Sequence, residues 1–330
     1  MTTKKEDLYP YLRQYGSHCM AYTSLEPQME TFILEGVGYI AFIRFKHFLW
    51  ARKERQIVLA DPICAVNNYK KLIRAFTEKY PNVIFVQSSK DTASVLTELG
   101  FQANLFGVEN EISLLDFSLK GKYRAKLRQW KNKCEREGVR VEEKPISACE
   151  NIDEITALSS KWLKTKGGDG LSFLVRPLRF EQETDVRYFW AYKDNELVGL
   201  ALFDPIYKGN KVIGYYHNID RISENAPHGT SATIILKAIE RFKVEGVERV
   251  SLGMSPMFVP NGLKNEFNYH PFTRKAFRYA FQKLNFLYSF KGNLSHKKKF
   301  GGLHKPIYIS STNGNGLREV FVMMKAIGML

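Results

Sequence analysis

The chain has 330 residues, 44% of them hydrophobic and 25% charged, so it can bury a sizeable core and we expect two domains. Its 49 Lys and Arg against 34 Asp and Glu give a formal net charge of +15, which favours nucleic acid or an anionic lipid surface as partner. An aromatic content of 13% argues against disorder, the first residues lack the apolar segment of a secretory signal, and no apolar run approaches the ~20 residues of a membrane span.

The first half alternates strand-like and helical segments after a helical entry over residues 1–35. Runs rich in Val, Ile, Phe and Tyr predict strands at 36–45, 48–53, 56–62, 83–89 and 111–116. Apolar periodicity predicts a helix from Asn67 to Tyr80, and Asp91 is the expected cap of a short helix that reaches Leu99. Four cysteines without CxxC spacing indicate reduced cytoplasmic thiols and no metal site.

Residues Asp116–Gly138 are predicted to form one amphipathic helix, with Ser118 as its N-cap and Gly138 as its stop. Five residues share its apolar face: Leu119, Tyr123, Leu127, Trp130 and Cys134. The other faces carry Lys and Arg almost throughout, so the helix would repel itself along its outer side. Such a helix is either a solvated surface helix or a docking face for a polyanion.

The second half repeats this order loosely. A helix is expected at 151–164, a Gly-rich loop at 165–171, and strands at 187–193, 196–203, 211–220, 247–254 and 308–311. Hairpin turns are expected at Asp194–Asn195 and at Lys208–Asn210. Further helices are expected at 230–245 and 271–287. We therefore predict a duplicated α+β fold with domains at 1–143 and 144–330, the second carrying most of the site.

Each half resembles the GNAT acyltransferase fold in its element order, but not in the turn where that fold binds the pyrophosphate of acetyl-CoA. At the corresponding turn, Ala226 and Ser231 depart from the GNAT pattern, and Pro227 removes a backbone N–H donor. We therefore do not expect acetyl-CoA to bind.

A more specific resemblance rests on a set of short motifs: FSLKG (117–121), APHGT (226–230), SLGMSP (251–256), LYSFKG (287–292), KKKF (297–300), HKPIYI (304–309), ADP (60–62) and LGF (99–101). In order and spacing, from about residue 36 to 310, the chain resembles the C-terminal domain of bacterial phosphatidylglycerol lysyltransferases. The resemblance implies two tandem GNAT-like domains, each a mixed, mostly antiparallel sheet flanked by helices. It also implies transfer of an aminoacyl group from aminoacyl-tRNA to the glycerol hydroxyl of phosphatidylglycerol. Because that ester is already activated, no metal or nucleotide cofactor is expected.

The expected catalytic residues are Asp220, Arg221 and Lys299. The resemblance places Arg221 on the family's Arg, but it puts Asn218 where the family has Asp. Either Asp220 substitutes as base or ammonium partner, or the amino-acid specificity differs; an Asp–Arg pair at a strand end can also be a structural salt bridge. Lys299 matches a family Lys, and it would stabilise the oxyanion, hold a phosphate, or be a surface lysine.

Further residues complete the expected site. Those expected to bind substrate are Asn218, His217, Glu109, Gly229, Thr230 and Met254. Those expected to contact tRNA phosphates are Lys120, Arg124, Arg128, Lys297 and Lys298. Glu109 would orient an ammonium group or merely border a strand, and His217 would be a base or structural. His304 and Ile307 stand where the family pattern has Trp and Arg, which raises a different acceptor as an alternative.

We therefore predict a cytoplasmic aminoacyl-tRNA-dependent transferase, associated peripherally with the inner face of the membrane. Its partners would be aminoacyl-tRNA and an anionic phospholipid, without a metal ion or acetyl-CoA. Two alternatives stay open at this stage. One is the same donor with a soluble amine, hydroxyl or protein acceptor; the other is a non-catalytic module that binds tRNA or an anionic membrane.

Overall fold

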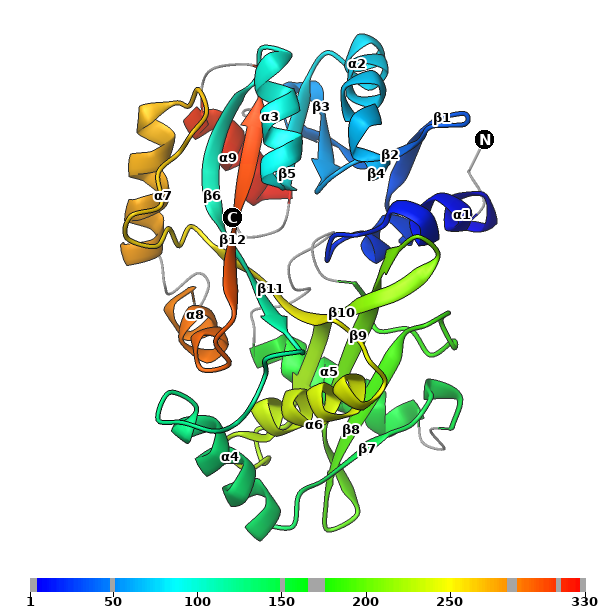
Figure 1. Ribbon diagram of the computed structural model, residues 1–330, viewed down its shortest axis with the longest axis vertical. Helices are drawn as coiled ribbons and strands as arrows, with labels where there is room; N and C mark the ends of the chain where they lie inside the picture. Colours follow the sequence, from blue (N-terminus) through cyan, green and yellow to red (C-terminus); the bar gives the residue numbers. More distant parts are fainter. Residues whose placement is uncertain are drawn as a thin grey trace.

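One long mixed sheet runs through both halves of the chain in the computed structural model (Figure 1), which describes residues 5–47, 51–148, 152–165, 176–283, 290–312 and 316–326. Its strand order is β1-β2-β3-β5-β12-β6-β11-β10-β9-β8-β7, and β4 pairs with β2. The strands are β1 (Glu30–Leu34), β2 (Gly38–His47), β3 (Ala51–Leu59), β4 (Ile63–Cys64), β5 (Val83–Ser88), β6 (Gln102–Ser113), β7 (Arg140–Glu143), β8 (Arg187–Lys193), β9 (Glu196–Lys208), β10 (Lys211–Ile222), β11 (Arg249–Pro256) and β12 (Leu303–Ser311).

Helices flank this sheet (Figure 1). They are α1 (Lys5–Tyr15), α2 (Tyr69–Lys79), α3 (Lys90–Glu98), α4 (Ala125–Arg136), α5 (Ile152–Thr165), α6 (Thr230–Val244), α7 (Pro271–Lys283), α8 (Phe290–Lys298) and α9 (Gly316–Ala326), with short 3-10 turns at Tyr22–Leu25, Val66–Asn68 and Ile146–Ala148. Within the part of the chain that the structure describes, none of the helices is long and apolar enough to span a bilayer.

The two halves share a local plan. In each, one pair of strands is parallel and joined through a helix: β3 and β5 through α2, and β10 and β11 through α6. All other pairings among the described strands are antiparallel. The predicted α+β class, with a mixed and mostly antiparallel sheet flanked by helices, is confirmed. The hairpin turn at Asp194–Asn195 is also confirmed, since both residues are left-handed (φ 51° and 65°), as a type I′ turn requires.

The halves do not keep separate sheets. β12, near the end of the chain, lies between β5 and β6, and β6 pairs on its other edge with β11. Strand β12 therefore completes the sheet of the first half, although it comes from the segment assigned to the second. The division between residues 143 and 144 stays a prediction.

The basic helix is shorter than predicted. Residues 116–124 form a loop, with Gly121 left-handed (φ 88°), and α4 begins only at Ala125. Two side chains predicted to face a polyanion instead hold this loop: the Arg124 guanidinium donates to the carbonyls of Ser118 and Phe300, and Arg128 donates to those of Leu119 and Gly121. Ser118 is therefore not the N-cap. The apolar stripe within α4 is correct, because Leu127, Trp130 and Cys134 are buried.

Several smaller predictions were wrong. Ser89, not Asp91, caps α3, since its side chain accepts from the Thr92 N–H. Residues 51–59 form one strand rather than parts of two. Helix α8 was not predicted. The helix expected at 271–287 is present as α7 up to Lys283, and its last predicted residues lie outside the described residues. Most of the expected Gly-rich loop at 165–171 lies outside the described residues.

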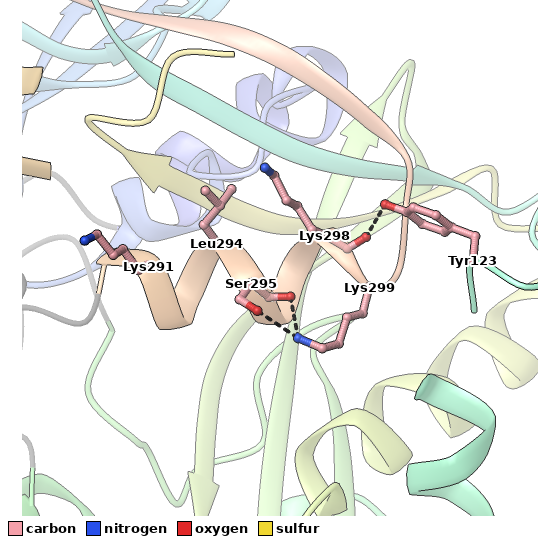
Figure 2. Close-up of a pocket in the computed structure, with 6 residues that line it drawn as sticks. All are labelled: Tyr123, Lys291, Leu294, Ser295, Lys298 and Lys299. Atoms are coloured by element: carbon pink, nitrogen blue, oxygen red, sulfur yellow. Dashed lines mark hydrogen bonds between the residues drawn. The ribbon is translucent and has the colours of Figure 1, made fainter. Parts of the chain in front are cut away.

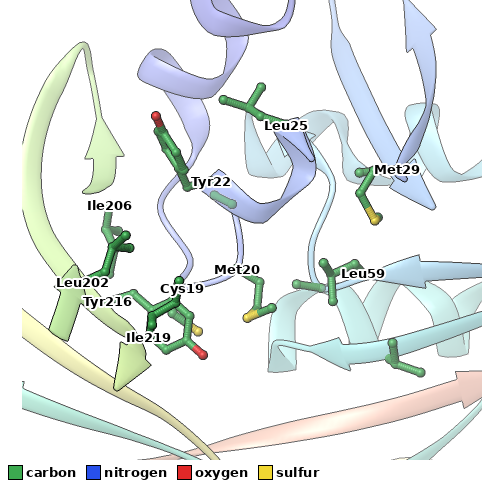
Figure 3. Close-up of a cluster of buried hydrophobic side chains, with 14 of the residues drawn as sticks. Cys19, Met20, Tyr22, Leu25, Met29, Leu59, Leu202, Ile206, Tyr216 and Ile219 are labelled. Atoms are coloured by element: carbon green, nitrogen blue, oxygen red, sulfur yellow. The ribbon is translucent and has the colours of Figure 1, made fainter. Parts of the chain in front are cut away.

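The largest buried cluster joins the two halves. Figure 3 shows side chains of residues 19–29 packed between Leu59 of β3 and the β9 and β10 residues Leu202, Tyr216 and Ile219. In addition, the amide of Tyr207 on β9 donates to the Gly16 carbonyl. The segment after α1 thus packs between the two halves and holds strands of both halves in one core.

Candidate active site

The site lies where two parallel strands part. β10 and β11 pair only over Gly214–Tyr216 and Arg249–Ser251, although β10 continues to Ile222 and β11 to Pro256. Beyond this point β10 stays with β9 while β11 follows β6, and α8 packs against β11. The polar segment 217–221 falls in the part of β10 that pairs with β9 but no longer with β11. The carboxyl ends of parallel strands that diverge are a usual place for ligand sites.

Asp220 and Arg221 leave opposite faces of β10, as consecutive strand residues must. The Asp220 carboxylate accepts a 2.6 Å hydrogen bond from the hydroxyl of Ser231, at the start of α6. The Arg221 guanidinium lies 4.0 Å above the ring centroid of Trp162 on α5, and it donates to Ser159 at 3.4 Å. Burial lowers the pKa of Arg221 to about 10, against the opposing charge of Asp220. The Ser231 hydroxyl therefore helps to orient the Asp220 carboxylate.

Asn218 occupies a β-bulge in the pairing of β10 with β9, which re-aims its side chain. Its Nδ2 donates at 2.6 Å to the carboxylate of Asp204, which is fully buried and ion-paired with Arg176. Arg176 also binds Glu26 (2.8 Å) and Glu183. An aspartate at 218 would set two carboxylates against each other, so this network explains why an amide stands there. The Asn218 Oδ1 has no hydrogen-bond partner among the described residues.

Lys297 points into the site rather than toward solvent. Its Nζ donates at 2.7 Å to the Met254 carbonyl, and burial lowers its pKa to about 7, although the charges of Cys19 and Glu109 oppose this. Met254 lies opposite Glu109 in the register of β11 with β6, and Glu109 accepts from the Ser251 hydroxyl at 2.6 Å. The expected grouping of Glu109 with Met254 is therefore present. The inward direction of the Lys297 amine argues against its expected contact with tRNA phosphates, which stays untested.

Two partly buried histidines lie near enough to Lys297 for its charge to affect them. His217 packs against Phe203 with ring centroids 5.1 Å apart, and burial lowers its pKa to about 3. His296 stacks on Trp130 at 6.3 Å, and burial lowers its pKa to about 4 while the charge of Asp220 raises it. Both are neutral at pH 7 and can accept a proton. Sequence reasoning missed His296, which precedes a lysine run and gives no periodic signal of burial.

Lys299 borders a hollow that Asp220 and Arg221 do not line. The hollow has a volume of about 520 Å³ (Figure 2) and is lined by Tyr123, Lys291, Leu294, Ser295, Lys298 and Lys299. Its Nζ donates to the Ser295 carbonyl (2.8 Å) and hydroxyl (2.9 Å), and it lies 5.2 Å from the Trp130 ring centroid. Of the three expected catalytic residues, this hollow is lined by Lys299 alone, and their catalytic roles stay a prediction. Lys299 still influences the pKa of His296, which it lowers, so the hollow adjoins the site.

The turn before α6 is covered by α4. A Cβ on Gly229, which is left-handed (φ 110°), would lie 2.6 Å from the Cβ of Trp130. Thr230 is buried, and its hydroxyl donates to the Pro227 carbonyl at 2.7 Å. These two residues therefore pack α4 against α6, and their expected contact with substrate stays a prediction.

Of the residues expected to meet phosphates, only some are available. Arg124 and Arg128 are engaged with carbonyl groups of the preceding loop. Lys120 and Lys298 are exposed, and the Lys298 Nζ lies 4.5 Å from the ring centroid of Phe258. Among the described residues no group of three or more His, Cys, Asp or Glu side chains is arranged to hold a metal ion.

Comparison with known proteins identifies the family of this chain. The family described as "Phosphatidylglycerol lysyltransferase, C-terminal" matches residues 10–310. A phosphatidylglycerol lysyltransferase of Bacillus subtilis is 23% identical over 283 residues, which cover 83% of this chain and 32% of the relative. The chain thus spans about a third of the length of the curated relatives that it matches.

Solved structures agree on the fold. The structure of L-PGS from Bacillus licheniformis superposes with a TM-score of 0.80 at 20% identity, covering 100% of this chain and 99% of that one. The C-terminal domain of a putative lysylphosphatidylglycerol synthetase from Agrobacterium fabrum gives 0.77 at 20% identity, with 99% and 98% covered. The predicted resemblance is confirmed: the chain belongs to the family of phosphatidylglycerol lysyltransferase C-terminal domains.

Proposed function

We propose that this chain transfers an aminoacyl group from aminoacyl-tRNA to a hydroxyl group of phosphatidylglycerol or a related anionic lipid. The observation that carries the proposal is the family match over residues 10–310, together with two partly buried, neutral proton acceptors, His217 on β10 and His296 on α8. Transfer from an ester needs a group that takes the hydroxyl proton and a cation or donor that stabilises the oxyanion.

His296 is the proposed base. Its imidazole is neutral at pH 7, and the Asp220 carboxylate, held by Ser231, favours the protonated form that arises when the acceptor hydroxyl loses its proton. A base whose protonated form is stabilised by an oriented carboxylate is a recurring arrangement in acyl transfer. Asp220 therefore keeps a place in the mechanism, but as the partner of the base.

Lys297 is the proposed oxyanion donor. With a pKa of about 7, its amine can carry the positive charge when negative charge develops on the ester oxygen. Glu109 lies in the same group and would pair with the α-ammonium of the aminoacyl cargo. Asn218 Oδ1 would accept a hydrogen bond from the cargo, because Asp204 already fixes its Nδ2 as a donor.

Exposed cations around the hollow would bind phosphate groups of the donor. Lys120 and Lys298 are the exposed members of the set expected to contact tRNA phosphates, and Lys298 lines the hollow together with the partly buried Lys299. Each phosphate contact of this kind steepens the dependence of tRNA affinity on salt by about one unit in a log–log plot.

The test is transfer itself. Labelled aminoacyl-tRNAs, supplied one at a time with phosphatidylglycerol vesicles, should give a labelled lipid that depends on intact tRNA. His296→Gln and Asp220→Asn should lower kcat by roughly 10²-fold or more, the size usual for loss of a general base. Lys237→Gln, an exposed change on α6, is the matched control. Absence of labelled lipid with every aminoacyl-tRNA would refute the proposal.

A second candidate keeps the donor and changes the acceptor. Ile307, which stands where the family pattern has Arg, is buried in the core shared by the two halves, so no cation is presented from that position. A soluble amine or hydroxyl acceptor is compatible with the absence of a cation at this position. Replacing vesicles with the small-molecule fraction of a cell lysate would then yield a labelled soluble product and leave lipid unlabelled.

A further inference from the structure

Helix α7 exposes aromatic side chains that no other part of the described chain covers. Phe272 and Tyr279 are each 61% exposed, and their spacing of seven residues puts them on one face. The opposite face is anchored, because Phe277 is buried with its ring centroid 5.2 Å from that of Phe106 on β6. The outward aromatics therefore belong to a packed helix with two distinct faces.

The charge on α7 is of one sign. The helix carries Arg274, Lys275, Arg278 and Lys283, and it has no Asp or Glu. Lys275 and Arg278 are exposed between the two aromatics, and the Lys275 Nζ lies 5.7 Å from the Phe272 ring centroid. Aromatic residues interleaved with cations on one face of a helix are typical of helices that lie in the interface of an anionic membrane.

The position of α7 agrees with this pattern. Figure 1 shows α7 on the same flank of the molecule as α8, whose outer side borders the hollow of Figure 2. That hollow combines the apolar surface of Leu294 with three lysines, a combination that suits a phosphate headgroup above the start of an acyl chain. Proteins that stack bases commonly do so in a concave groove or on a sheet, whereas the α7 aromatics project from a convex helix. A lipid surface is the better partner for this face.

We infer that the outer face of α7 docks on an anionic lipid bilayer, through Phe272 and Tyr279 with Lys275 and Arg278 beside them. Docking there presents the hollow beside α8 to the lipid headgroups. The inference rests on the proposed function only for the role of the lipid as acceptor, since binding to a bilayer does not require catalysis.

The experiment is flotation of the full chain with vesicles, without tRNA, in low salt. One set of vesicles contains phosphatidylglycerol and phosphatidylcholine, and the other contains phosphatidylcholine alone. Lys275→Gln/Arg278→Gln should weaken binding to the anionic vesicles about thirtyfold, since each basic residue near an anionic surface contributes about 1 kcal/mol. Phe272→Ser/Tyr279→Ser should weaken it roughly tenfold or more through lost apolar contact.

Matched control variants remove two positive charges or an exposed apolar side chain from surfaces other than α7. Lys208→Gln/Lys211→Gln takes two exposed charges from the β9–β10 hairpin, on the opposite side of the molecule in Figure 1. Val244→Ser removes an apolar side chain that is 84% exposed on α6. The charge pair should change vesicle binding by less than threefold, and Val244→Ser should leave it unaltered.

The outcomes separate this inference from the proposed function. Equal loss in the α7 variants and their controls, or wild-type binding that is the same on neutral and anionic vesicles, would overturn the docking inference. So would an α7 variant that loses affinity for tRNA and keeps vesicle binding, because α7 would then face nucleic acid. Wild-type transfer to a short-chain phosphatidylglycerol dispersed as monomers reports on the proposed function alone, since no bilayer is present.

Discussion

Replacing Lys297 with methionine should make the protein more stable at pH 7, because this lysine amine lies where its charge is disfavoured. Burial lowers its pKa from the ordinary 10.5 to about 7. Between these two pH values the unfolded chain binds a proton that the folded chain does not. The free energy of unfolding therefore falls as the pH is lowered through that window, and the loss is complete below about pH 7.

The magnitude follows from the same pKa. At 1.36 kcal/mol per pKa unit, a lowering from 10.5 to about 7 costs at most about 5 kcal/mol. The variant loses the 2.7 Å hydrogen bond from Nζ to the Met254 carbonyl, worth about 1–2 kcal/mol. Methionine has a similar length and adapts to the space. We expect Lys297→Met to raise the free energy of unfolding by about 2–3 kcal/mol at pH 7. Near pH 10.5 the Lys297→Met variant should be less stable than wild type by about 1 kcal/mol, because at that pH the lost hydrogen bond is the only difference between the two proteins.

Urea unfolding of both proteins at pH 7 and at the highest pH that leaves unfolding reversible measures the difference. Lys298→Met, at the exposed neighbouring position, is the control and should change the free energy of unfolding by less than about 0.5 kcal/mol at either pH. A Lys297→Met protein that is less stable than wild type at pH 7 would refute the reasoning. So would a difference that does not change with pH.

Three further outcomes are expected. Arg176→Met should cost about 3–5 kcal/mol in chemical denaturation, because it leaves the Asp204 carboxylate buried without its cation; an unchanged midpoint would contradict that role. Gly229→Ala should lower stability by about 1–3 kcal/mol, since the residue is left-handed and its new Cβ would meet Trp130; a thermal melt equal to wild type would count against this packing. Lys120→Gln should reduce the slope of log tRNA affinity against log salt by about one without changing the melting temperature; an unaltered slope would remove Lys120 from the tRNA surface.

Local structure was largely determined by the sequence. The stripe of Leu127 and Trp130 on α4, the strand at 83–88 and the left-handed turn at Asp194–Asn195 follow from periodicity and turn chemistry, which act over a few residues. The set of short motifs was also sufficient to indicate the family, because the order and spacing of motifs can be read without knowing which residues contact each other in the fold. The +15 charge indicated an anionic partner in the same way.

Contacts between distant segments were decided only by the tertiary structure. Periodicity shows that a side chain is buried but not what it meets, so β12 beside β5, and Glu109 opposite Met254, could not be read from the sequence. The three consecutive lysines at 297–299 show this most clearly. They are chemically identical in the sequence, yet successive positions of a helical turn point about 100° apart. The fold therefore sends one amine toward Glu109, one outward to solvent and one to the face of Trp130, and their chemistry differs because their surroundings do.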